Sequence, residues 1–221
     1  MTPSRRSWIV PVIAGGGISA MTFPGQTAGL AVFTDPLLHQ LGIDRTLLSL
    51  SYLIGTLVGA AVQPLLGRLM DRWDVRRVII AIAVVFSLTL VGLSFVQNLV
   101  GLTVGYVGIR MFGQGALGLA SSTAVAQIVR RRRGLALGIS GAIGSAGISL
   151  APVLLERLVA GVGIAWAWRI EALAVLIIVV PLALLLPRPT LIEPERTRTD
   201  SGTLIVGGFT SAQARRTGMF W

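Results

Sequence analysis

The chain has 221 residues, of which 53% are hydrophobic and only 13% are charged, and its net charge is +10. Soluble domains carry about 25% charged residues, so most of this chain does not face water. It has no cysteine and one histidine, which excludes disulfides, thiolate chemistry and a histidine-based metal site. Its basic residues, all of them arginine, lie in short clusters between apolar runs, which argues against a nucleic-acid-binding face.

Six apolar segments are long enough to cross a bilayer, whose core needs about 20 mostly apolar residues per helix. They run from about 8 to 33, 47 to 66, 78 to 96, 102 to 129, 135 to 155 and 166 to 186. We therefore expect an all-α polytopic membrane protein, with a six-helix transmembrane bundle over residues 1–187. Residues 188–221 begin as a Pro-, Thr-, Glu- and Arg-rich segment, which predicts a cytoplasmic linker, and end in a basic, aromatic stretch that predicts the start of a seventh helix.

The arginines alternate between the two ends of these expected helices. One side has only Arg45, Arg157 and Arg169, and the other side has Arg5, Arg6, Arg68, Arg72, Arg76, Arg77, Arg130 to Arg133, Arg188, Arg196, Arg198, Arg215 and Arg216. Because cytoplasmic loops are rich in Lys and Arg, we expect a multi-pass inner or plasma membrane protein with both termini in the cytoplasm. The alternative, a cleaved secretory signal at the N-terminus, would break this alternation.

The first two apolar segments each carry a polar stripe. Pro24 and Gly25 can kink or open the first helix and free backbone groups for a bound solute. Such stripes either line a polar cavity or join helices by hydrogen bonds and close packing, and the sequence leaves both readings open. Their members are Gly15, Ser19, Thr22, Gln26 and Gly29 in the first segment, and Ser49, Tyr52, Thr56, Gly59 and Gln63 in the second.

The charged stretch GRLMDRWDVRR, residues Gly67 to Arg77, separates the second and third apolar segments. Gly67 is expected to end a helix at the membrane surface. Asp71 can accept hydrogen bonds from the backbone amides at a helix N-terminus. Arg72, Arg76 and Arg77 can pair with acidic groups or lipid phosphates. A signal for membrane topology alone is the alternative interpretation of these arginines.

This stretch resembles the conserved loop between helices 2 and 3 of the major facilitator superfamily. Met70 and Asp74 depart from the family pattern, which has a small residue and a glycine there. The resemblance implies the N-terminal half of a twelve-helix transporter that works by alternating access, in which this loop clamps the two halves in one conformation. The matching residues are Gly67, Leu69, Asp71, Arg72, Arg76 and Arg77.

The fourth apolar segment contains one charge, Arg110, followed by Gln114 and Gly115, and members of the superfamily often have an Arg and a Gln-Gly pair in this helix. An arginine inside a membrane helix is costly and indicates a functional role. At helical spacing, Gln114, Gly118 and Ser121 share its face, which predicts a polar cavity. The alternative is that Arg110 extends to the outer headgroups.

The fifth segment begins RRRRGLALGISGAIGSAG and resembles the monocarboxylate-porter branch of the superfamily, although the acidic motif of that branch is missing from the first segment. Its small residues predict close helix packing through Gly134, Gly138, Gly141 and Ser145. Glu171 is expected at the outer interface near Arg169, with a proton-coupling role as the alternative. The residues that match the branch are Arg131 to Arg133, Leu135, Ala136, Gly138, Ala142 and Gly147.

These patterns together predict a secondary transporter and not an enzyme, with no cofactor or metal. The resemblance implies a small organic anion, such as a monocarboxylate, moved with a proton. The partners are then the solute, the lipid bilayer, and a C-terminal transporter half or a second copy of the chain. A truncated or non-transporting six-helix protein and a half-size homodimeric transporter remain alternatives. The residues expected to bind the solute are Gln26, Tyr52, Arg110 and Gln114.

Overall fold

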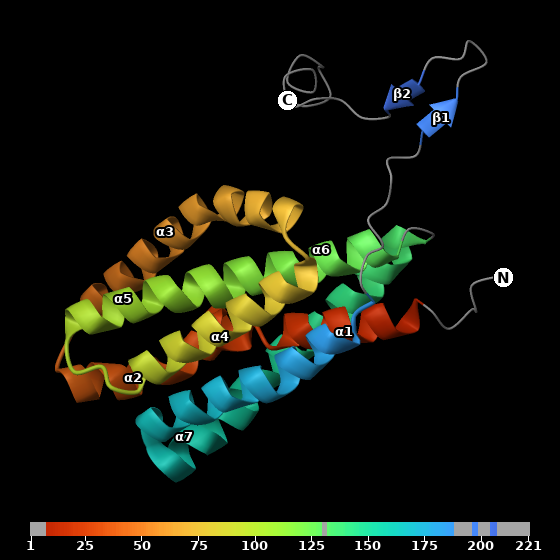
Figure 1. Cartoon of the computed structure of the whole chain (residues 1–221). Coiled ribbons are helices and arrows are strands. Elements are labelled where there is room, and N and C mark those ends of the chain that lie inside the picture. The colour runs from red at the N-terminus through yellow and green to blue at the C-terminus, as the bar shows by residue number, and fades with distance from the viewer. Residues whose placement is uncertain (1–7, 130–131, 188–195, 199–203, 207–221) are drawn as a thin grey trace. The chain divides into compact units, whose positions relative to one another are not determined.

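The structure is a computed structural model that describes residues 8–129, 132–187, 196–198 and 204–206. The chain divides into one unit up to Arg188 and a second unit from Pro189. Every element described in the first unit is a helix, which confirms the all-α prediction for this part of the chain (Figure 1). The second unit contains an antiparallel pair of strands, β1 (Arg196–Arg198) and β2 (Leu204–Val206), which the linker prediction did not include. The expected start of a seventh helix lies outside the described residues.

The first apolar segment forms two helices separated by a short turn. The helix α1 (Ile9–Ala20) is followed by the 3-10 turn η1 (Phe23–Gly25) and by α2 (Thr27–Leu41). The break lies at Pro24 and Gly25, where the sequence predicts it, because proline cannot continue the hydrogen-bond ladder of a helix. The helix continues past the expected end near residue 33 and stops at Gly42, whose left-handed backbone (φ 62°) favours glycine.

The charged stretch spans the end of one long helix, α3 (Arg45–Arg72), and the start of the next, α4 (Val75–Leu93). The expectation that Gly67 ends a helix is wrong, because α3 continues through it for more than one further turn. Helix α4 begins instead at Asp74, whose carboxylate accepts a 3.0 Å hydrogen bond from the backbone N–H of Arg76. Asp74 has a negative φ of −58°, so this tight connection does not require the glycine of the family pattern.

The fourth apolar segment is one helical run with an altered middle. Helix α5 (Leu99–Ile109) leads into the π-helical segment η2 (Arg110–Leu117) and then into α6 (Gly118–Ile128). Asn98 caps its start by accepting a 2.7 Å hydrogen bond from the N–H of Gly101. π-helical turns are rare and cluster at functional sites. Because η2 begins at Arg110, its position indicates a functional site at this residue.

The last helix, α7 (Arg133–Leu185), has 53 residues and would be about 80 Å long if it were straight. Gly163 interrupts it with the non-helical angles φ 77° and ψ 169°, and the ribbon folds back on itself (Figure 1). We call residues 133–162 the first arm and residues 164–185 the second arm. The arms correspond to the fifth and sixth apolar segments.

Small residues bring α1 against the first arm of α7. A side chain at Gly15 would collide with Val125 of α6, and one at Gly16 would collide with Ile143 of α7. Gly144 and Gly147 lie equally close to Ser19 and Ala20. The packing expected of Gly134, Gly138 and Gly141 is not found, because a Cβ at any of the three would meet no atom within 4 Å. Close packing within the described unit therefore uses the later glycines of this segment.

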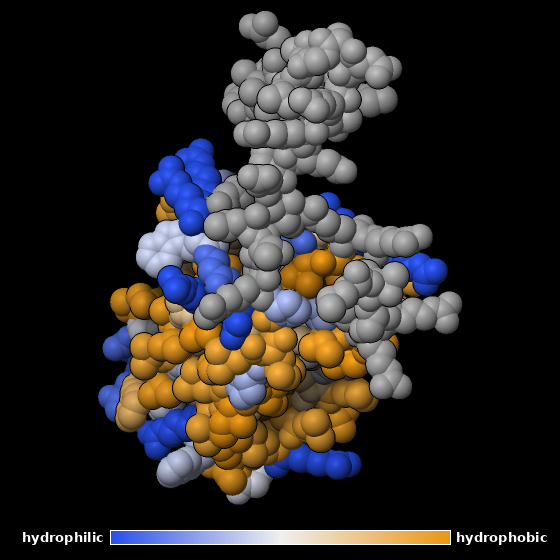
Figure 2. All heavy atoms as spheres, turned by 45° about the vertical axis from the view of Figure 1, so that its right-hand side comes forward, coloured by the Kyte–Doolittle hydropathy of each residue, from blue (hydrophilic) through white to orange (hydrophobic). Residues whose placement is uncertain are grey.

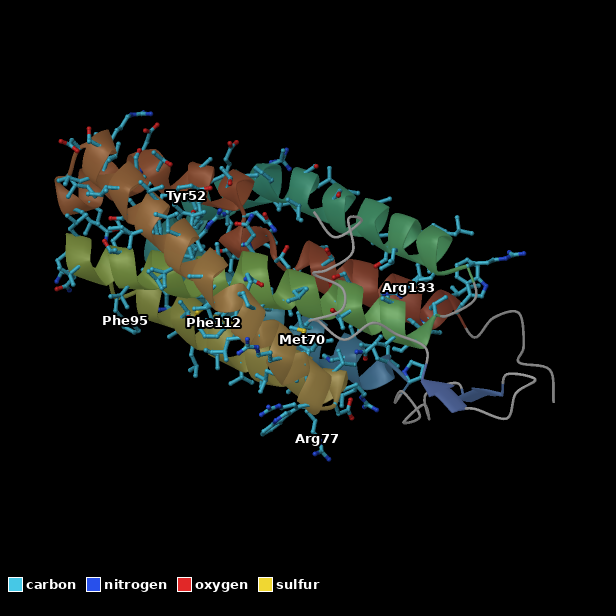
Figure 3. The ribbon with its side chains drawn as sticks, turned by 90° about the horizontal axis from the view of Figure 1, so that it is seen from above. Tyr52, Met70, Arg77, Phe95, Phe112 and Arg133 are labelled. Atoms are coloured by element: carbon cyan, nitrogen blue, oxygen red, sulfur yellow. The ribbon has the colours of Figure 1, made fainter. Side chains whose placement is uncertain are left out.

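Three helices are long and apolar enough to cross a membrane by their length and composition: α3 (to Met70), α4 and α7. Apolar side chains cover most of the visible face of the helical unit, with hydrophilic ones toward its margins (Figure 2). The connection after α2, the connection after α4 and the turn at Gly163 lie at one end of the unit (Figure 1). Arg77 and Arg133 lie toward the other end, away from Phe95 (Figure 3).

Candidate functional site

A pocket of about 430 Å³, lined by both polar and apolar residues, opens between α3 and the run from η2 to α6. Volumes of this size suit small ligands. The polar stripe of α3 and the polar face of the fourth segment meet here, and each contributes residues that the sequence analysis placed on one helical face. The pocket is lined by Thr56, Gly59, Ala60, Gln63, Arg110, Gln114, Gly115, Gly118, Leu119 and Ser122.

Arg110 is the charged residue of this pocket, and its side chain is held by three groups. Nε donates a 3.1 Å hydrogen bond to the hydroxyl of Thr56, and Nη1 donates one of the same length to the carbonyl oxygen of Gly25. The guanidinium lies 4.7 Å from the centre of the Tyr52 ring, within cation–π range. The residue is 7% exposed, so its side chain is enclosed within the helical unit. The remaining nitrogen, Nη2, has no hydrogen-bond partner among the described residues.

The position of Arg110 along its helical run places it deep in the unit. It lies 11 residues after Leu99, the first residue of α5, which corresponds to about 16 Å. The hydrocarbon core of a bilayer is about 30 Å thick. If α5 begins at the membrane surface, Arg110 therefore lies near mid-depth, where an isolated charge would be most costly.

The break in the first segment and the π-helical segment are in direct contact. A Cβ at Gly25 would come within 2.8 Å of the backbone nitrogen of Gln114 and within 3.1 Å of the Cα of Gly113. A Cβ at Gly113 would in turn collide with the ring of Phe86. Only glycine fits at both positions, and this close approach brings the Gly25 carbonyl within reach of Arg110.

The π-helical segment changes which residues share the face of Arg110. Ideal α-helical spacing places Ser121 on this face, but Ser121 is buried and does not line the pocket. Ser122 lines it instead. A π-helical turn inserts about one extra residue relative to an α-helix, which shifts the following residues by one position. The expected face is therefore correct up to Gly118 and wrong at Ser121.

The four residues expected to bind the solute are not all in the same pocket. Arg110 and Gln114 line the larger pocket. Tyr52 lines a neighbouring pocket of about 200 Å³, and its hydroxyl is 2.6 Å from the hydroxyl of Thr27. Gln26 lines neither pocket, and its amide donates a 3.0 Å hydrogen bond to Thr22. Tyr52 and Arg110 nevertheless touch, so three of the four are connected.

The site also contains groups that the expected set did not include. Thr56 accepts from Arg110, and its hydroxyl donates a 2.9 Å hydrogen bond to the carbonyl of Tyr52. Gln63 packs against Gly115, where a Cβ would collide with its amide. Both belong to the polar stripe of α3, so the stripe was the signal that could have selected them. For the carbonyl of Gly25, the Pro-Gly break was the one sequence feature that pointed to a free backbone group.

The residues of the charged stretch are placed only in part. The side chain of Asp71 lies outside the described residues. Arg72 and Arg77 are exposed, and Arg76 is half-buried. The ion pair found among the described residues joins Arg45 to Asp35 at 2.7 Å and does not involve this stretch. Met70, which replaces the small residue of the family pattern, is buried in the core.

Glu171, which the sequence analysis expected at the outer interface near Arg169, is only 3% exposed, so its side chain is buried inside the helical unit and does not face water or lipid. It lies eight residues past Gly163 on the second arm of α7, facing the core. Neither carboxylate oxygen has a hydrogen-bond partner among the described residues, and the same is true of the Tyr106 hydroxyl and the Trp168 indole nitrogen. Glu171 lines neither pocket described above.

Comparison with known proteins identifies the family. The family model described as Major Facilitator Superfamily matches residues 11–221, which is nearly the whole chain. No curated protein matches the chain. The match over both the helical unit and the following segment agrees with the apolar helices and with the motif that spans the end of α3 and the start of α4. The chain therefore belongs to the major facilitator superfamily, whose members are membrane transporters of small solutes and not enzymes.

Proposed function

We propose that this chain carries one half of a solute pathway and that the pocket around Arg110 binds a small organic anion, such as a monocarboxylate. The observation that carries the proposal is a buried arginine, in a pocket of about 430 Å³, whose Nη2 has no hydrogen-bond partner among the described residues. Because Thr56 and Gly25 fix the other two nitrogens, the guanidinium is oriented before a ligand arrives, and an oriented guanidinium is well suited to a carboxylate.

The proposal includes six membrane spans, with both termini in the cytoplasm of an inner or plasma membrane. Helices α3 and α4 and the two arms of α7 account for four of them. The run from α1 to α2 and the run from α5 to α6 account for the others. In neither run is a single helix longer than 15 residues, because η1 and η2 interrupt them. Broken helices at mid-depth are typical of transporter binding sites.

The partner in this proposal is a C-terminal transporter half or a second copy of the chain. The open glycines Gly134, Gly138 and Gly141 support it, since such residues allow another helix to approach closely. The solute would then move by rocking of two halves around the pocket, in company with a proton. The stretch comprising Gly67, Asp71, Arg72, Arg76 and Arg77 would act as the conformational clamp between the halves.

The experiment is equilibrium binding of a labelled monocarboxylate to the purified chain in nanodiscs, with the corresponding uncharged amide as the matched ligand. We expect saturable binding of the acid but not of the amide, and loss of binding in Arg110→Gln. The control is Arg157→Gln, because Arg157 is exposed and distant from the pocket in sequence. Equal binding of acid and amide, or unchanged binding in Arg110→Gln, would exclude the organic-anion site.

A blot of native membranes with an antibody to the N-terminal segment distinguishes the two kinds of partner. A band near the chain's own mass of 23.3 kDa would favour a half-size transporter that pairs with itself. A band near twice that mass would mean that the second half is part of the same polypeptide. A single copy of the chain that takes up solute in proteoliposomes would contradict both.

A further inference from the structure

Arg169, on the second arm of α7, is a further arginine whose side chain is held by neighbouring groups. Its guanidinium lies 4.8 Å from the ring centre of Phe95 and 4.9 Å from that of Trp166. Nε donates a 3.1 Å hydrogen bond to the hydroxyl of Ser94. The two terminal nitrogens have no hydrogen-bond or ion-pair partner among the described residues. Phe95, Trp166 and Ser94 thus fix the orientation of a guanidinium whose outer edge remains available.

The two aromatic rings lie on the surface of the helical unit. Phe95 is 65% exposed and Trp166 is 58% exposed. Phe95 follows the end of α4, and Trp166 lies three residues after the turn at Gly163, so both lie at the same end of the unit (Figure 1). Exposed tryptophan at the end of an apolar helix is typical of the membrane–water interface. The two exposed rings therefore indicate the depth of the lipid headgroups for Arg169.

Exposed apolar side chains continue from this arginine along α4 and the second arm of α7. These two helices are in contact, since the Ser87 hydroxyl donates a 2.9 Å hydrogen bond to the carbonyl of Ala172. The spacing of the apolar side chains by three or four residues places the members of each set on one helical face. Such faces suit acyl chains below a headgroup. The exposed residues are Leu88 and Val91 on α4, and Ile170, Leu173 and Ile177 on α7.

We propose that Arg169, Phe95 and Trp166 form a binding site for the phosphate of an anionic phospholipid, with its acyl chains along α4 and the second arm of α7. The terminal nitrogens form the fork that matches phosphate oxygens. Glu171 does not compete for them, because residues two positions apart point to opposite sides of a helix. A lipid is favoured over free phosphate because the arginine is bordered by exposed apolar surface. The site is separate from the Arg110 pocket and does not depend on which solute is carried.

The test is native mass spectrometry of the chain released from nanodiscs that contain phosphatidylglycerol and phosphatidylcholine. We expect wild type to retain phosphatidylglycerol preferentially, and Arg169→Gln to weaken this retention about tenfold or more, as loss of hydrogen bonds to a charged group implies. Arg157→Gln is the matched control, since Arg157 is an exposed arginine on the other arm without aromatic partners among the described residues. It should retain the lipid as wild type does.

Two further variants separate the binding site from a structural role. Arg169→Lys keeps the charge but loses the fork, and Phe95→Leu keeps the arginine but removes one ring. Both should fold, as judged by circular dichroism, and both should weaken retention by less than Arg169→Gln does. Equal retention in wild type and Arg169→Gln would overturn the proposal. So would equal loss in Arg157→Gln, or displacement of the lipid by millimolar inorganic phosphate, which would indicate a site for free phosphate.

Discussion

The Nη1 atom of Arg110 donates a 3.1 Å hydrogen bond to the carbonyl oxygen of Gly25, which joins the π-helical segment of one helical run to the broken turn of another. One irregular segment supplies a hydrogen-bond donor, and the other supplies an acceptor. The broken turn places a buried carbonyl without a helical partner near the arginine, and the arginine supplies a donor for it. The pocket thus rests on two local departures from α-helical geometry.

Replacing Arg110 should lower the stability of the unit as well as anion binding. In Arg110→Gln the Gly25 carbonyl and the Thr56 hydroxyl lose their donor, and a buried group left unpaired costs about 1–3 kcal/mol. We expect a lower midpoint of thermal unfolding in detergent, with Arg110→Lys intermediate because one ammonium cannot reproduce the fork. Arg157→Gln, at an exposed position, should unfold as wild type does. An unchanged midpoint in Arg110→Gln would mean that the observed contacts do not stabilise the fold.

A methyl group at Gly25 should disrupt the contact between the two irregular segments. The added Cβ meets backbone atoms of Ile109 and Gln114, which cannot move aside as a flexible side chain can. Overpacking of this kind costs about 1–3 kcal/mol. The control is Gly92→Ala in α4, where a Cβ meets nothing within 4 Å and should be neutral or stabilising. Thermal unfolding of both variants in the same detergent provides the comparison, and equal midpoints would refute the close approach.

The register shift produced by the π-helical segment can be tested by cysteine labelling, since the chain contains no cysteine of its own. Ser122 lines the pocket and Ser121 is buried. We expect Ser122→Cys to react with a water-soluble thiol reagent in nanodiscs and Ser121→Cys to react much more slowly, because reactivity requires access to the thiol. Faster labelling of Ser121→Cys would indicate that the helix keeps a regular α-helical register.

Asp74 should stabilise the start of α4 through its side chain. Its carboxylate accepts from the Arg76 N–H, and loss of such a cap costs about 0.5–2 kcal/mol. Asp74→Ala is therefore expected to lower the thermal midpoint, while Asp74→Asn, which keeps an acceptor oxygen, should lie close to wild type. If Asn lowered the midpoint as much as Ala, the negative charge rather than the cap would be responsible.

Glu171 should be replaceable without loss of stability. Both of its carboxylate oxygens are buried and have no hydrogen-bond partner in the part of the chain that the structure describes. Replacing an unsatisfied polar group by an apolar group of similar shape is nearly neutral or stabilising. We expect Glu171→Met to unfold at the same temperature as wild type or higher. A fall in the midpoint would show that the carboxyl group has a stabilising partner, such as a buried water. If Glu171→Gln then unfolded as wild type does, hydrogen bonding rather than the carboxylate itself would explain that stabilisation.

The sequence by itself determined the helical class, most of the helix positions and the family motif at the end of α3, because these depend on local composition. Long apolar runs favour helices whatever surrounds them, and Pro24 breaks a helix through its own ring. Arg110 could be selected as a functional residue from the sequence because it is the one charge in its apolar segment. The two polar stripes could likewise be predicted, since helical spacing alone groups their members.

Only the tertiary structure decided which of these residues meet. Gly25 and Arg110 are 85 positions apart in sequence, yet they share a hydrogen bond, and no local pattern predicts that contact. The open glycines of α7 and the packed ones look alike in sequence, because close packing depends on the facing helix. Ser122 rather than Ser121 lines the pocket because the π-helical segment shifts the register of the helix. Glu171 is buried because α7 folds back at Gly163. These outcomes are set by contacts between distant segments, which periodicity along a single chain does not contain.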